Sequence, residues 1–115
     1  MKHRVSDAAD FGKLVMVNLD DGGHLAFTWM RPSSDGALRR VMNGWPPQPE
    51  DWDEEGRVLW IVDMAATPGV SGIRVGRTLG KVLHKLQIAQ EGEIVVYRRE
   101  TGALKGRFGK AIVRG

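Results

Sequence analysis

A single carboxylate, Asp63, directly follows an apolar run near the middle of the chain. The run, residues 58–62, is short, continuous and rich in β-branched and aromatic side chains, which is the pattern of a buried central strand. The sequence therefore predicts Asp63 at or near the C-terminal end of a strand, where α/β-type sheets present functional groups. An ionised carboxylate at such a place must be paired, hydrogen-bonded or open to a cleft. Asp63 is a candidate catalytic acid, and the alternative is an acid that caps the next turn or holds a backbone amide.

A glycine-containing turn and a basic helix are predicted soon after Asp63, over residues 70–87. A strand followed by such a turn and a helix N-terminus is a usual way to hold pyrophosphate, because the first backbone amides of the helix are free. The candidate cofactor-binding residues are Gly72, Arg74, Gly76 and Arg77. The alternative is a helix start whose glycines serve only close packing.

The same segment is amphipathic. Its apolar residues recur at helical spacing and comprise Val75, Leu79, Val82, Leu83 and Leu86. Its cations fall on a different face and comprise Arg74, Arg77, Lys81 and Lys85. We expect the apolar face to pack on the sheet and the cations to form an exposed stripe.

Charge is divided unevenly along the chain. Residues 1–72 carry seven basic side chains against eleven acidic ones, whereas residues 73–115 carry ten against three. A basic field of this kind attracts phosphates, nucleic acid or an acidic protein. The alternative is a solvated basic face that only aids solubility.

Composition narrows the classes of protein and of site. The 115 residues include no cysteine, which excludes disulfides, thiolate zinc sites and cysteine nucleophiles and favours a cytoplasmic location. No apolar run has the length of a signal peptide or a membrane span. The three histidines, His3, His24 and His84, show no metal-ligand spacing, and the length fits a single domain, residues 1–115.

Turn signals divide the rest of the chain into short elements. The pattern predicts strands over 13–19 and 24–30 around a glycine-rich turn, a helix over 37–42, the strand over 58–62, and strands over 93–98 and 107–113. His24 is expected on the more polar face of its strand. The order β-β-α-β-α-β-β predicts an α+β domain with a largely antiparallel sheet.

Two resemblances follow from these motifs. The segment 71–79 resembles the cofactor loop of GNAT-type acyltransferases, with Gly72 at the first glycine of the pattern and Arg74 where that family has a small residue. The stretch from Asp51 to Gly69 is similar to the central signature of the toxin-activating lysine acyltransferases, the activator proteins of RTX haemolysins. It shares Asp51-Trp52, Gly56, the aromatic strand that ends in Asp63, and Ala66 and Gly69. Thr67-Pro68 stands where that family has Pro-Phe.

The resemblance implies a GNAT-like fold and a defined reaction. Members of that family move a fatty acyl group from acyl carrier protein to lysines of an acceptor protein, and a His and an Asp are their catalytic residues. Asp63 corresponds to the Asp. His3, in the pair His3-Arg4, is the candidate for the His, although fewer residues separate it from Trp29 than the family's spacing implies. We expect no tightly bound cofactor, with acyl-acyl carrier protein as the donor.

Lysine acylation needs a base, because an ammonium with a pKa near 10.4 is no nucleophile until it loses its proton. With Asp63 and a short N-terminal segment, we expect little or no transfer by this chain alone and a role in binding a partner. Two alternatives remain: a non-catalytic interaction module, and a nucleic-acid-binding protein that uses the basic helix. Homodimerisation also stays open.

Overall fold

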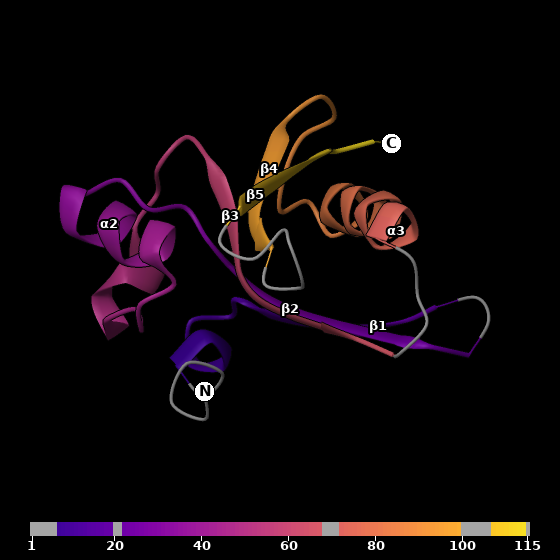
Figure 1. The fold of residues 1–115 in the computed structure, drawn as a ribbon, viewed down its shortest axis with the longest axis horizontal. Coiled ribbons are helices and arrows are strands. Elements are labelled where there is room, and N and C mark those ends of the chain that lie inside the picture. The colour runs from indigo at the N-terminus through magenta and orange to yellow at the C-terminus, as the bar shows by residue number, and fades with distance from the viewer. Residues whose placement is uncertain (1–6, 20–21, 68–71, 100–106, 115) are drawn as a thin grey trace.

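The protein is described by a computed structural model over residues 7–19, 22–67, 72–99 and 107–114. Its centre is a five-stranded sheet in the order β1-β2-β3-β4-β5 (Figure 1). The strands are β1 (Leu14–Asn18), β2 (His24–Met30), β3 (Leu59–Ala66), β4 (Ile94–Arg99) and β5 (Arg107–Ile112). The helices are α2 (Asp35–Asn43), the 3-10 helix η1 (Pro49–Asp53) and α3 (Gly72–Lys85). The predicted α+β class and the predicted order of strands and helices are confirmed.

The sheet is mixed, with one parallel pair. β1 pairs with β2, β2 with β3, and β4 with β5 in antiparallel fashion, whereas β3 and β4 run parallel. A parallel pair needs a crossover connection, and α3 supplies it. The predictions of a largely antiparallel sheet and of a central strand at β3 are both confirmed.

α3 covers one face of the sheet. Leu79 and Leu83 are fully buried there and belong to one core with Phe27, Leu59 and Val95, as the helical spacing predicts. Burial of Leu86 was also expected, and this is wrong, because Leu86 is 50% exposed. α3 ends at Lys85, and a left-handed Gln87 with φ 59° redirects the chain. Ile88 and Ala89 then pack on the core in place of Leu86.

A second core lies on the opposite face of the sheet. It joins Trp60 and Met30 of the sheet to Val41 of α2, Trp52 of η1 and Ala8. Ala8 is part of a helical turn at residues 7–10. In Figure 1 this turn and α3 lie on opposite sides of β1, β2 and β3, so the sheet is the middle layer of the fold.

α2 and η1 are linked by a bidentate ion pair. Arg40 donates from Nε to Asp51 Oδ2 at 2.7 Å and from Nη2 to Oδ1 at 2.6 Å, and Asp51 is buried. The hydrogen bond and the charge of Asp51 raise the pKa of Arg40 against the opposing effect of burial. The acidic segment 50–56 therefore begins within a 3-10 helix, and its second acid, Asp51, is structural.

Candidate functional site at the separation of β3 and β4

Asp63 lies inside a strand. The sequence predicts it at the C-terminal end of the central strand, but β3 continues through Asp63 to Ala66, so that prediction is corrected. β2 is long enough to pair with this extension, from Asp63 opposite Thr28 to Ala66 opposite Leu25. Pairing with the neighbouring strand thus overrides the low strand propensity of the two alanines.

The ladder between β2 and β3 is interrupted directly before Asp63. Trp29 faces Ile61 and Thr28 faces Asp63, so Val62 is an extra residue and forms a β-bulge. The Asp63 amide has a side-chain acceptor here, because it donates to Thr28 Oγ1 at 3.1 Å. Thr28 is almost fully buried, so its hydroxyl holds the strand where the acid stands.

The parallel pair of strands separates at the same place. β3 and β4 are in register only at Leu59 with Val95, Trp60 with Val96, and Ile61 with Tyr97. Beyond that point, residues 63–66 of β3 pair with β2, and residues 98–99 of β4 pair with β5. We call this separation the β3/β4 fork. In the described part of the chain no strand lies between its two arms.

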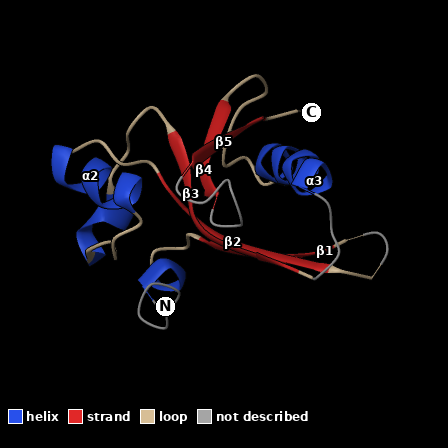
Figure 2. Cartoon of the chain, viewed as in Figure 1, coloured by secondary structure: helices blue, strands red, loops and turns tan. Residues whose placement is uncertain are grey.

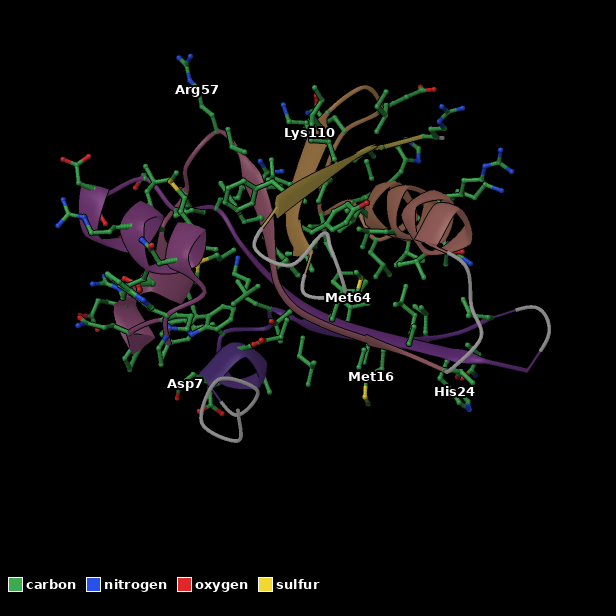
Figure 3. The ribbon with its side chains drawn as sticks, in the orientation of Figure 1. Asp7, Met16, His24, Arg57, Met64 and Lys110 are labelled. Carbon is green, nitrogen blue, oxygen red and sulfur yellow. The ribbon has the colours of Figure 1, made fainter. Side chains whose placement is uncertain are left out.

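The α3 side of the fork is lined by apolar and aromatic groups. Met64 faces this side of β3, where Figure 3 shows it opposite in direction to Met16. Tyr97, on the last paired position of β4, packs against the α3-side core. Its ring lies over Gly109 of β5, where any Cβ would collide with the ring. The lack of a side chain at Gly109 therefore leaves room for the Tyr97 ring at the point where the strands part.

Trp29 and Lys13 form a polar contact next to the bulge. Lys13 Nζ lies 3.9 Å from the centroid of the Trp29 ring, which is a cation–π geometry. Burial lowers the pKa of Lys13, Asp53 opposes this shift, and Arg31 adds to it. The Trp29 indole N–H is buried and has no hydrogen-bond acceptor among the described residues.

A second ion pair closes the end of β2 against the start of β4. Arg31 donates to Glu93 Oε1 at 3.1 Å and to the Ile88 carbonyl at 2.9 Å. Burial alone would raise the pKa of Glu93, but the hydrogen bonds from Arg31 and the Gln90 amide outweigh it and hold the pKa below the ordinary value. Arg31 therefore has a structural role and does not add to the charge of the fork.

The structure does not gather the predicted site residues on one side of the sheet. Asp63 faces the same side as Thr28, which alternates with the α3-side residue Phe27, so the acid points away from α3. Gly72 is the first residue of α3, Gly76 is half-buried with open space around it, and Arg77 is exposed. The Arg74 side chain and His3 lie outside the described residues.

The remaining histidines fit structural or surface roles. His24 is exposed, as predicted, and its Nδ1 lies 2.9 Å from Asn18 Oδ1. Its backbone amide donates to Thr67 Oγ1 at 2.7 Å, which ties the start of β2 to the end of β3. Within the described ranges, no three His, Asp or Glu side chains are placed to hold a metal ion.

Two residues of this site, Thr28 and Tyr97, were not predicted from the sequence. Thr28 carries no pattern of its own, because a threonine in a strand is ordinary. Tyr97 had an indirect signal in Gly109, since a glycine inside a strand often marks the close approach of another group.

No protein-family model matches this chain, and no curated protein matches it. None of the described helices combines the length and apolar composition needed to cross a bilayer.

Proposed function

We propose that this chain is an acyltransferase-like protein with a GNAT-like fold, related to the toxin-activating lysine acyltransferases. It binds the acyl thioester arm of acyl carrier protein in the β3/β4 fork. The observation that carries this proposal is the end of the parallel ladder at Ile61 and Tyr97, two residues before Asp63. An extended amide-containing arm can add to an exposed strand edge through backbone hydrogen bonds, and the fork offers such an edge.

The lining of the fork suits the acyl end of such a ligand. Met64 and Tyr97 present apolar surface on the α3 side, where a fatty chain would be removed from water. The Trp29 indole N–H, which has no acceptor among the described residues, can donate to a carbonyl oxygen.

Any transfer would use Asp63 and His3. A lysine ammonium of the acceptor loses its proton to the base, and the amine attacks the thioester carbonyl. The tetrahedral intermediate then expels the thiolate, and the attacking nitrogen loses a second proton, which the thiolate takes up to leave as a thiol. Asp63 faces the side of the sheet covered by the turn at residues 7–10, and His3 precedes that turn in the sequence. Because Asp63 faces away from the α3 side, where Met64 and Tyr97 line the fork, we propose that binding is retained and that transfer is weak or absent.

The exposed cations of α3 supply the docking surface for an acidic carrier protein. Arg77, Lys81 and Lys85 follow one another at intervals of four residues and are all exposed, so they form one stripe along the helix. The same stripe favours nucleic acid as a second candidate ligand, since phosphates need only such cations.

Titration separates these candidates. Acyl carrier protein loaded with a fatty acyl group, coenzyme A and random duplex DNA are each titrated at two salt concentrations. We expect the carrier to bind, and to bind more weakly when Arg77 and Lys81 are replaced by glutamine. Equal binding of any DNA with a steep salt dependence would establish the nucleic-acid function instead.

Intact-mass spectrometry of a lysine-rich acceptor tests the transfer step. The acceptor is incubated with this chain and the loaded carrier, and we expect little or no added acyl mass. Stoichiometric acylation that disappears in both His3→Ala and Asp63→Asn would overturn the binding-only role and make the chain an active enzyme.

A further inference from the structure

Among the described residues, no helix or strand covers part of the sheet face opposite α3. Val58 directly precedes β3, and Ile94 at the start of β4 stands opposite Ile112 at the end of β5. They are 44%, 51% and 53% exposed. The next row of the same face holds Trp60, Val96 and Lys110. Phe108, 41% exposed, completes the set by an edge contact on Trp60, with ring centroids 5.4 Å apart.

We call these seven side chains the β3–β5 patch. Parallel strands are usually covered on both faces, yet α2 and η1 cover only the part over β2 and β3, where Val41 and Trp52 pack with Met30 and Trp60. The second core is therefore open on its β4 and β5 side. A contiguous exposed apolar surface of this kind marks an interaction site.

Two cations, Lys110 and Arg57, stand within and beside the patch. Lys110 stands within the second row and is exposed, and Arg57, next to Val58, is exposed as well. Figure 3 shows both cations at the same end of the sheet. The seven residues of the patch include no carboxylate. These cations favour a partner that carries acidic residues.

α2 and η1, which lie beside the patch, limit the shape of a partner that can bind there. α2 and η1 lie on the same side of the sheet as the patch (Figure 2) and stand above the plane of the strands. A flat bilayer would meet these helices before it met the patch. A single helix, about 10–12 Å in diameter, can lie on the strands as the next member of the same layer.

We infer that the β3–β5 patch binds an amphipathic helix of a partner protein, with an apolar face toward Ile94 and Ile112 and acidic residues toward Lys110 and Arg57. The patch uses the beginning of β3 and leaves the fork beyond Ile61 free. The inference is thus independent of the acyl-carrier proposal, and either one can fail alone.

Two synthetic helical peptides test this. Both carry the same apolar residues at i, i+3, i+4 and i+7, and one has glutamate flanks where the other has lysine flanks. Binding of the fluorescein-labelled peptides to the full chain is followed by fluorescence anisotropy. We expect the acidic peptide to bind and the basic one to bind at least about tenfold more weakly, as one unfavourable charge pair can produce.

Variants of the chain test whether the β3–β5 patch is the surface that binds the acidic peptide. Ile94→Ser with Ile112→Ser should abolish binding of the acidic peptide, and Lys110→Glu should weaken it and improve binding of the lysine-flanked peptide. Met16→Ser is the matched control, because Met16 is an exposed apolar residue on the same side of the sheet but on β1. Far-ultraviolet circular dichroism and the denaturation midpoint show that each variant is folded.

Several results would overturn the inference. They are equal binding of both peptides, binding unchanged in the Ile94 and Ile112 variant, and no binding at all. Sedimentation that shows a dimer lost in Ile112→Ser would assign the patch to a second copy. Recruitment to phosphatidylserine-containing vesicles, without peptide binding, would assign it to a membrane surface.

Discussion

The amide of Asp63 donates to the buried hydroxyl of Thr28, at 3.1 Å across two neighbouring strands. This bond lies directly after the bulge at Val62, where the regular exchange of backbone hydrogen bonds is broken. A side chain of β2 thus satisfies the backbone of the residue that carries the candidate acid, and it does so without using the carboxylate.

Thr28→Val tests whether the backbone amide of Asp63 depends on the hydroxyl of Thr28. Valine keeps the shape but leaves the buried Asp63 amide without its acceptor, at a cost of about 1–3 kcal/mol in the free energy of unfolding. Hydrogen exchange of the Asp63 amide should accelerate in Thr28→Val and stay slow in Thr28→Ser, which retains the oxygen. Equal protection in both variants would show that another group holds this amide.

Asp63→Asn should leave the fold intact. Asparagine has nearly the same volume and keeps the backbone bond to Thr28, so we expect the free energy of unfolding to change by no more than about 1 kcal/mol. Any acyl transfer should be lost. Unfolding or aggregation of the variant would instead show that the carboxylate is a structural group.

Leu83→Ala tests the packing of α3. Leu83 is fully buried, and its truncation should cost about 2–5 kcal/mol by denaturant titration. Leu86→Ala is the matched control one residue past the end of α3, and because Leu86 is half exposed it should cost well under half as much. Similar costs for the two would contradict the described end of α3.

Gly109→Ala should destabilise the sheet, since its Cβ would collide with the Tyr97 ring. Overpacking of this kind costs about 1–3 kcal/mol. Gly76→Ala, in open space within α3, should stabilise by up to about 1 kcal/mol through helix propensity. Adding Tyr97→Ala should make Gly109→Ala nearly neutral, and a full additional cost in that background would rule out the ring as the cause.

Acid should weaken the fold through Glu54 and Glu93. Hydrogen bonds from Ser34 and Ser33 hold the pKa of Glu54 below its ordinary value despite burial, and Arg31 and the Gln90 amide do the same for Glu93. A carboxyl whose pKa is lower in the folded state stabilises the fold above its unfolded pKa of about 4.3. That contribution is lost as the pH falls through the folded pKa.

The denaturation midpoint, measured between pH 6 and pH 3, checks this. We expect the midpoint to fall over this range, and to fall less steeply in Glu93→Gln. The exposed Glu91→Gln, two residues away, serves as the control and should leave the slope unchanged. An identical slope in Glu93→Gln and the parent protein would show that Glu93 does not contribute to the loss of stability in acid.

Local signals predicted most of the fold. Alternation over residues 24–30 gives β2 its bounds, and Ser34 caps α2 while Gly44 ends it in the left-handed region, as their residue types indicate. The extension of β3 beyond Val62 was not predicted, because it depends on pairing with β2. The ion pair of Arg31 with Glu93, 62 residues apart in sequence, likewise leaves no local pattern.

The site was predicted only in part. Asp63 was singled out from its place after an apolar run, but which face it occupies depends on the bulge at Val62, and a one-residue shift reverses the face of every residue that follows. The separation of β3 from β4 is a property of two strands that α3 joins. No spacing within either strand records where their pairing stops.

The short ladder between β3 and β4 also bears on the order of folding. The β1–β2 and β4–β5 hairpins pair neighbours in the sequence and close early, whereas the parallel pair must wait for α3 to bring its strands together. The parallel contact is a seam of three paired positions, which joins the acidic half of the chain to the basic half. Opening that seam breaks few backbone hydrogen bonds and leaves both hairpins whole, so the fork lies at the joint where the sheet can part most easily.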